Sequence, residues 1–363
     1  MEYSDSNNSI FMGYIKEESN MADTKYTMIG MSSAGKTCYI TAMYMKMAVG
    51  LSGFTLVTDD KTRAKFERDI LALREPVGQE RFPIATNETT TNSYEFKLSY
   101  ETKKIITFEM IDYAGGVLRT RENIYLQIKK SIAESTALYI FIDGKSFCSD
   151  DREERKENVY YDCAMTVTPI IQDFADTHGG NLPPIVFVVT KSDLCKQYVT
   201  SQEITSVIKE LFSPAFSDKT YTYICAVSLG DTISDDGYKG KFKPINIHIP
   251  FFIGSYHEYY NQCIVIQSDI EKGNKVIQEE KAMEDSKAEK ELKKWRLFRD
   301  EDYIKQCRER AKASEAALKS NNEALNNVKN LFYKLGDRLE VESPNFKCFI
   351  DGVEQSKFKR FNL

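Results

Sequence analysis

The sequence has few of the residues that bind structural metals. It contains three histidines, and its eight cysteines are scattered along the chain without a CxxC pair. A structural zinc site needs clustered cysteine and histidine ligands, so this spacing argues against one. Because the chain is large and has no secretory signal, we expect its cysteines to be reduced core residues.

Long apolar runs are also missing. The longest apolar stretches, at 136–143 and 182–189, fall far short of the ~18 residues that a membrane-spanning helix needs. The first 20 residues are polar and lack the basic start and apolar run of a signal peptide. We therefore expect a cytoplasmic chain without a transmembrane segment.

An excess of positive charge is absent too. The chain has 49 Lys and Arg residues against 54 Asp and Glu residues, which gives a net charge of −5. Domains that bind nucleic acid usually carry a basic surface, so we expect no nucleic-acid partner. The small basic cluster at 293–299 is diluted by neighbouring acidic residues.

Strand-like and helix-like segments alternate through the first two thirds of the chain. Short apolar or alternating segments predict six strands, at 26–29, 93–99, 104–111, 137–142, 185–189 and 221–227. Helical segments separate several of these strands, for example at 36–49 and 60–76. This alternation indicates an α/β fold, with a mostly parallel sheet flanked by helices. We assign the α/β domain to residues 24–265, after a polar leader at 1–23.

The pattern changes after this domain. Residues 266–340 contain no proline and carry dense, mixed charge, and from Ile304 to Leu339 apolar residues recur every three or four positions. This spacing predicts a coiled-coil-like helical arm. The arm is either an amphipathic helix pair folded back on the α/β domain or an intermolecular coiled coil. Ser314 and Asn321 weaken the apolar seam, which slightly favours the first arrangement. Residues 341–363 form a C-terminal tail in this interpretation.

A motif of the form GxxxxGK[ST] lies between the first predicted strand and the first predicted helix. Its glycines let the main chain wrap around a phosphate, and the N–H groups at the helix start face the anion. Lys36 would reach the β- and γ-phosphates, and the Thr37 hydroxyl would bind Mg²⁺. A flexible turn before an ordinary helix is the alternative, but the strand–loop–helix context argues against it. The expected nucleotide contacts are Gly30, Ser32, Ser33, Ala34, Gly35, Lys36, Thr37 and Cys38.

Asp112 follows the strand at 104–111 and opens a DxxG sequence. A carboxylate at the C-terminal end of a parallel strand lies where α/β sheets bind ligands, so Asp112 would hold Mg²⁺. Gly115 would meet the γ-phosphate through its N–H group. A plain strand-ending turn is the alternative at this position.

The segment Thr190-Lys191-Ser192-Asp193 has the form [NT]KxD and follows another predicted strand. A carboxylate at Asp193 can accept two hydrogen bonds from guanine, and adenine offers no such pair of donors. Lys191 would lay its aliphatic stem over the base. After the last strand, Ser228 and Leu229 would add a main-chain N–H group to the guanine O6 atom. The alternative is a solvated Lys–Asp loop.

The order of these motifs resembles that of the Ras-like P-loop GTPases over residues 24–235, and the resemblance extends to 265 at most. The MIDYAGG loop and the FPIAT stretch resemble most closely the bacterial double-GTPase or conflict-system branch of the translation-factor-related class. The resemblance implies a mostly parallel six-stranded sheet, Mg²⁺-dependent binding of GTP and GDP, and two nucleotide-sensing switch loops.

The resemblance also implies a switch I threonine that binds Mg²⁺ and the γ-phosphate. Thr86 and Thr89 are the expected positions, and Thr90 and Thr91 stay open. Gly116 stands where Ras-like enzymes carry the glutamine that orients water, so intrinsic hydrolysis is expected to be slow.

Other side chains near the DxxG motif would have to take over the role of that glutamine. Arg119 is the first candidate for an internal arginine finger, with Arg121 as the alternative, and Glu122 could orient the attacking water. For each of the three, a solvated helix face is the more ordinary interpretation.

We therefore expect a GTP-dependent switch that hydrolyses GTP slowly and acts on a protein partner, or on a second copy, through the helical arm. A nucleotide-bound scaffold with negligible turnover is the second hypothesis, motivated by Gly116. An ATP-using P-loop enzyme is the third, and the TKxD motif argues against it.

Overall fold

The structure is a computed structural model, and it describes residues 24–75, 78–83, 91–113, 115, 122–233, 239–293 and 301–363. The strands in this part of the chain are β1 Thr24–Gly30, β2 Phe54–Thr58, β3 Asn92–Tyr100, β4 Lys103–Asp112, β5 Ala137–Asp143, β6 Ile185–Thr190, β7 Tyr221–Ala226, β8 Phe346–Ile350 and β9 Val353–Gln355. The α-helices are α1 Lys36–Ala48, α2 Asp60–Leu73, α3 Glu122–Ala133, α4 Arg152–Val159, α5 Met165–Thr177, α6 Ser192–Cys195, α7 Ser201–Leu211, α8 His248–Lys293 and α9 Glu301–Glu342.

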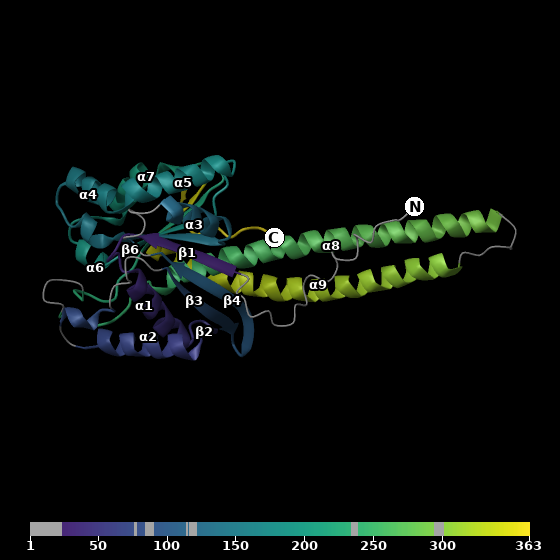
Figure 1. The fold of residues 1–363 in the computed structure, drawn as a ribbon, viewed down its shortest axis with the longest axis horizontal. Coiled ribbons are helices and arrows are strands. Elements are labelled where there is room, and N and C mark those ends of the chain that lie inside the picture. Colours follow the sequence, from purple (N-terminus) through teal and green to yellow (C-terminus); the bar gives the residue numbers. More distant parts are fainter. Residues whose placement is uncertain are drawn as a thin grey trace.

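The described strands form one mixed sheet in the order β2-β3-β4-β1-β5-β6-β7-β8-β9 (Figure 1). The five strands from β4 to β7 in this order are parallel. The pairs at both edges, β2–β3–β4 and β7–β8–β9, are antiparallel. The prediction of a mostly parallel sheet of six strands is therefore wrong, because three additional strands extend it and the edges are antiparallel.

The three additional strands are short, and two of them come from the predicted tail at 341–363. In that segment β8 pairs with β7, more than 100 residues earlier in the chain, and β9 pairs with β8. Such distant pairing leaves no local signal beyond a few apolar residues. The segment also packs on the arm, where the Phe361 N–H group donates to the Tyr256 hydroxyl at 2.8 Å.

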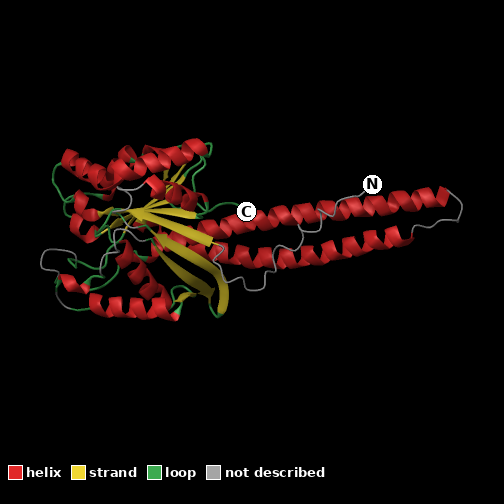
Figure 2. Cartoon of the chain, viewed as in Figure 1, coloured by secondary structure: helices red, strands yellow, loops and turns green. Residues whose placement is uncertain are grey.

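Helices cover both faces of the sheet in separate groups (Figure 2). On one face, α1, α2, α8 and α9 contribute to an apolar core with Phe66, Phe251 and Leu335 among its buried members. On the other face, α3, α5 and α7 bury residues such as Ile128 and Ile208. The phosphate-loop helix α1 therefore shares a core with the two long C-terminal helices.

Local signals explain where several helices begin. Asp59 caps α2, because its carboxylate accepts hydrogen bonds from the N–H groups of Lys61 and Thr62 at 3.0 Å each. At α7, Thr200 and Glu203 form a capping box. These caps satisfy N–H groups that have no partner inside the helix.

The predicted arm at 266–340 lies within α8 and α9, although α8 begins earlier, at His248, inside the segment assigned to the α/β domain. The two helices lie side by side and antiparallel and project beyond the sheet (Figure 1). Near the sheet, Phe332 of α9 stacks on Tyr256 of α8 with ring centroids 4.5 Å apart. Farther out, Lys281 and Glu315 form an ion pair at 3.2 Å. The helices therefore pair within one chain, and in the described part of the chain they contact the α/β domain at their base. Among the described residues, no helix has both the length and the apolar character needed to cross a membrane.

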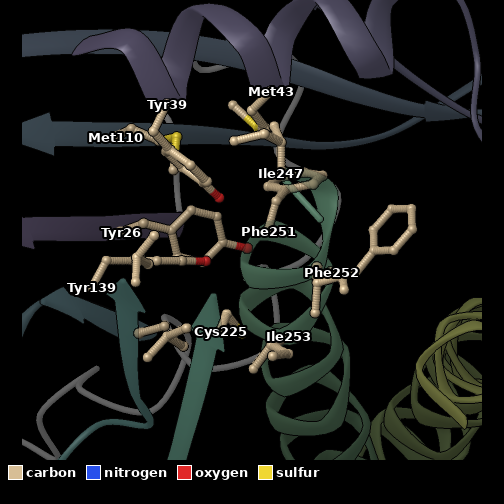
Figure 3. Close-up of a cluster of buried hydrophobic side chains, with 14 of the residues drawn as sticks. Tyr26, Tyr39, Met43, Met110, Tyr139, Cys225, Ile247, Phe251, Phe252 and Ile253 are labelled. Atoms are coloured by element: carbon tan, nitrogen blue, oxygen red, sulfur yellow. The ribbon is translucent and has the colours of Figure 1, made fainter. Parts of the chain in front are cut away.

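The base of α8 is fixed in a buried aromatic cluster, in which side chains of β1, β5 and α1 surround Phe251 (Figure 3). The Tyr139 hydroxyl donates to the Pro250 carbonyl at 3.2 Å. One turn later, a Cβ atom on Gly254 would lie 2.1 Å from that hydroxyl oxygen. Only glycine therefore lets α8 approach the sheet this closely.

Substituting Gly254→Ala is expected to lower the free energy of unfolding by about 1–3 kcal/mol, since the added methyl group meets a fully buried ring. Urea denaturation measures this change. Gly336→Ala in α9 is the matched control, because its Cβ would meet atoms at an ordinary 3.4 Å. In a Tyr139→Phe background Gly254→Ala should cost less than in the wild type, and an equal cost would contradict the proposed clash.

Candidate functional site

The loop between β1 and α1 depends on close main-chain approaches. A Cβ atom on Gly30 would lie 2.7 Å from Cβ of Phe141 in β5. Gly35 has a φ of 83° directly before α1, a left-handed conformation that favours glycine. Ser33 also lies in the left-handed region, with a φ of 65°. The loop thus ends at the N-terminus of α1, whose first N–H groups have no partner within the helix.

Lys36 is the first residue of α1 and its side chain is buried. Its Nζ atom donates to the carbonyls of Gly30 at 2.7 Å and Met31 at 3.1 Å. The same Nζ atom lies 4.0 Å from Oδ1 of Asp112. Burial lowers the pKa of Lys36, and the neighbouring carboxylate opposes that effect. The ammonium group is therefore held inside the loop.

Asp112 ends β4 and pairs in register with Met28 of β1. Its side chain is fully buried, and neither carboxylate oxygen has a hydrogen-bond partner among the described residues. Burial raises the pKa of Asp112 to about 6, although Lys36 acts in the opposite direction. A buried carboxylate whose oxygens accept no hydrogen bond fits a hard cation such as Mg²⁺, which prefers oxygen ligands. Thr37, half-buried in the first turn of α1, is the second expected ligand.

Gly115 lies directly against the phosphate loop. A Cβ atom at this position would be 1.9 Å from the Ser32 nitrogen and 2.1 Å from the Met31 carbonyl carbon. No other residue fits there without moving one of the two segments. The glycine of the predicted DxxG motif is thus brought next to the first half of GxxxxGK[ST].

The TKxD segment is fastened to the same loop. The Thr190 hydroxyl donates to the Ala34 carbonyl at 2.9 Å, and Nζ of Lys191 donates to the Ser33 carbonyl at 3.0 Å. Lys191 also forms an ion pair with Asp143 at the end of β5. These contacts place the predicted base site beside the predicted phosphate site.

Asp193 and Ser228 meet at the far end of this segment. Oδ1 of Asp193 accepts a hydrogen bond from the Ser228 hydroxyl at 2.8 Å. Oδ2 is buried and has no partner among the described residues. Burial raises the pKa of Asp193. One carboxylate oxygen is thus oriented by the protein, and the other is left for a donor from outside. The neighbouring Leu229 is half-buried and accepts the Lys243 N–H group at 2.7 Å.

Two residues of this region escaped the sequence interpretation. Asp143 fixes Lys191 through the ion pair, and Gly144 follows it with a Cβ position only 2.3 Å from the Thr190 carbonyl oxygen. The available signal was an aspartate and a glycine after the buried strand ALYIFI. That signal is weak, because many strands end in this way.

The structure brings together the described residues of the GxxxxGK[ST], DxxG and TKxD motifs, with Ser228 and Leu229, at the carboxyl ends of the central parallel strands. The remaining phosphate-loop positions, Ser32 and Cys38, are exposed and half-buried, respectively. Several predicted site residues lie outside the described residues, namely Thr86, Thr89, Thr90, Gly116, Arg119 and Arg121. Thr91 is exposed, and Glu122 begins α3. The roles expected of these residues stay predictions.

Comparison with known protein families agrees with this arrangement. No curated protein shows significant similarity to the chain. The family model described as Double-GTPase 2 matches residues 27–231, which is more than half of the chain. The match begins within β1 and ends just after Ser228, so it contains all the motifs described above. The resemblance to double-GTPases is therefore confirmed, and the chain belongs to the Double-GTPase 2 family.

Proposed function

We propose that the protein binds GTP and GDP with Mg²⁺ and hydrolyses GTP slowly. The observation that carries this proposal is the state of the Asp193 carboxylate, in which Ser228 orients one oxygen and the other is buried without a partner. A buried acceptor without a donor is unfavourable. The N1–H and exocyclic amine groups of guanine would supply two donors to this carboxylate, and adenine has no equivalent pair on that edge.

The phosphate end of the site supports the same proposal. Lys36 now donates to two loop carbonyls, and it would turn toward the β- and γ-phosphates of a bound nucleotide. Asp112 and the Thr37 hydroxyl would hold Mg²⁺. The ion would neutralise charge on the phosphates when it is bound. Gly115 is close enough to the loop for its N–H group to meet the γ-phosphate.

Slow hydrolysis is proposed because Gly116 has no side chain to orient the attacking water. Arg119 is our first candidate for the group that compensates, as an internal arginine finger. A switch I threonine, Thr86 or Thr89, would complete the Mg²⁺ and γ-phosphate contacts. These assignments rest on the order of residues in the sequence.

We further propose that α8 and α9 transmit the state of the switch loops to a protein partner or to a second copy of the chain. The support is the shared core, where Tyr39 and Met43 of α1 face Phe251 of α8 (Figure 3). A displacement of α1 would shift the base of α8, because densely packed cores resist compression and transmit strain. The scaffold hypothesis, in which the nucleotide is a structural ligand, is favoured by Gly116 alone.

Substituting Asp193→Asn should shift the preference from guanine to xanthine nucleotides by roughly 10²-fold, because the amide can donate to the second carbonyl of xanthine. Competition against fluorescent GDP measures the affinities for GDP, xanthosine diphosphate and ADP. Asp231→Asn is the control, since this exposed carboxylate lies in the same region and pairs with Lys196. Unchanged guanine selectivity in Asp193→Asn would refute the base site, and equal displacement by ADP in the wild type would favour an ATP-using enzyme.

Mg²⁺-dependent nucleotide binding should weaken as the pH falls below about 6, which is the raised pKa of Asp112. Protonation removes the negative charge that would hold the ion, so the benefit of Mg²⁺ should fall roughly tenfold per pH unit below that value. The measurement is GDP affinity with Mg²⁺ and with a chelator between pH 5 and 8. The Asp112→Asn variant reports the pH dependence that comes from titration of the nucleotide itself. In this variant the part of the pH dependence that arises from Asp112 should disappear. An identical pH profile in that variant would contradict the assignment.

Arg119→Ala should reduce single-turnover GTP hydrolysis by ~10³ while leaving GTP affinity nearly unchanged, because an arginine finger stabilises charge in the transition state. Arg121→Ala is the neighbouring control and should retain most of the activity. If neither substitution changes the rate, the internal arginine is excluded. If the wild type itself shows no turnover, the scaffold hypothesis is correct.

A further inference from the structure

Arg81 is a buried arginine that joins two distant segments of the chain. Its side chain is 3% exposed. The guanidinium donates through Nε to the Leu73 carbonyl at 3.1 Å, and Nη2 donates to the same oxygen. Through Nη1 it donates to the Gly240 carbonyl at 2.8 Å. These two acceptors are 167 residues apart in sequence, so a single side chain connects the end of α2 to the segment after Leu229.

The Leu73 contact gives Arg81 a fixed base. Leu73 is the last residue of α2, and its carbonyl has no acceptor role within the helix. A cation at this end also interacts favourably with the helix dipole. Two N–H groups on one carbonyl hold the plane of the guanidinium, which leaves Nη1 directed at Gly240.

The Gly240 contact reaches the predicted base site through tightly packed main chain. A Cβ atom on Gly240 would lie 2.3 Å from the carbonyl oxygen of Asp231 and from the nitrogen of Ile233. A Cβ atom on Gly230 would lie 2.0 Å from the Lys241 carbonyl oxygen. The limb held by Arg81, at 239–245, therefore lies directly against the limb at 228–233.

Hydrogen bonds continue this connection to the base-reading carboxylate. The Lys243 N–H group donates to the Leu229 carbonyl at 2.7 Å, and the main chains of Ser228 and Ile245 bond each other in both directions. The Ser228 hydroxyl then donates to Asp193 at 2.8 Å. The orientation of Asp193 thus depends on a limb that Arg81 fixes from the other side.

We propose that Arg81 is a positioning residue for guanine recognition, which holds the 239–245 limb so that Ser228 can orient the Asp193 carboxylate. This inference rests on the proposed guanine-nucleotide function and adds a residue outside the four sequence motifs. Without the guanidinium, the Gly240 carbonyl loses its donor and the limb can move away from Ser228. The expected result is a loss of discrimination at the base, with the phosphate contacts of Lys36 intact.

The test compares GDP with inosine diphosphate, which lacks the exocyclic amine that Asp193 would bind. In Arg81→Gln the ratio of GDP affinity to inosine diphosphate affinity should fall at least about fivefold, the size expected for one weakened hydrogen bond to a charged group. A general loss of stability would lower the folded fraction for both ligands and leave their ratio unchanged. Arg81→Lys keeps the charge but loses the planar fork, so a partial loss is expected.

Arg155→Gln is the matched control. Arg155 is also 3% exposed and donates to the Ser149 carbonyl at 2.7 Å, but it joins α4 to Glu203 in α7. Its affinity ratio should equal that of the wild type. An unchanged ratio in both Arg81 variants, with GDP bound by the wild type, would overturn this inference alone. If the wild type binds no GDP, the proposed function fails and the inference fails with it.

Discussion

A buried pair of opposite charges lies at the predicted phosphate site of this fold, and the surrounding loops are built around it. Nζ of Lys36 lies 4.0 Å from Asp112, whose carboxylate is fully buried and has no hydrogen-bond partner among the described residues. Two charges removed from water are stable only when their surroundings compensate for the lost hydration. The loop carbonyls of Gly30 and Met31 compensate Lys36, whereas the carboxylate accepts no hydrogen bond from the described residues. Gly115 lies beside this pair and packs against the main chain of Met31 and Ser32, where no side chain fits.

The two faces of the sheet carry separate apolar cores. On one face, α3, α5 and α7 complete a core that resembles the interior of any α/β domain. On the other face, the helix that follows the phosphate loop packs with the base of the helical arm. The helix that follows the predicted phosphate loop and the base of the arm therefore contribute side chains to the same buried core.

The phosphate and base motifs could be predicted because each is contiguous in sequence and follows a strongly apolar strand. β1, β5 and β6 are fully or almost fully buried, and the sequences of β5 and β6 are apolar except for their last residues. β2, β8 and β9 are short and lie at or near the sheet edges, and β8 finds its partner far away in the chain. Arg81 could not be found for a related reason. Its contacts to Leu73 and Gly240 exist only after α2 and the loop after Leu229 have folded next to each other.

The length of α8 has a mechanical consequence. Its 46 residues form one helix of about 69 Å, at ~1.5 Å per residue. The first turns of α8 are fixed in the aromatic cluster around Phe251. There Gly254 packs directly against the Tyr139 hydroxyl. A rigid rod held at one end works as a lever. The far end of α8 lies about 58 Å from Gly254, at ~1.5 Å per residue, so a tilt of ~5° at Gly254 would move that end by about 5 Å.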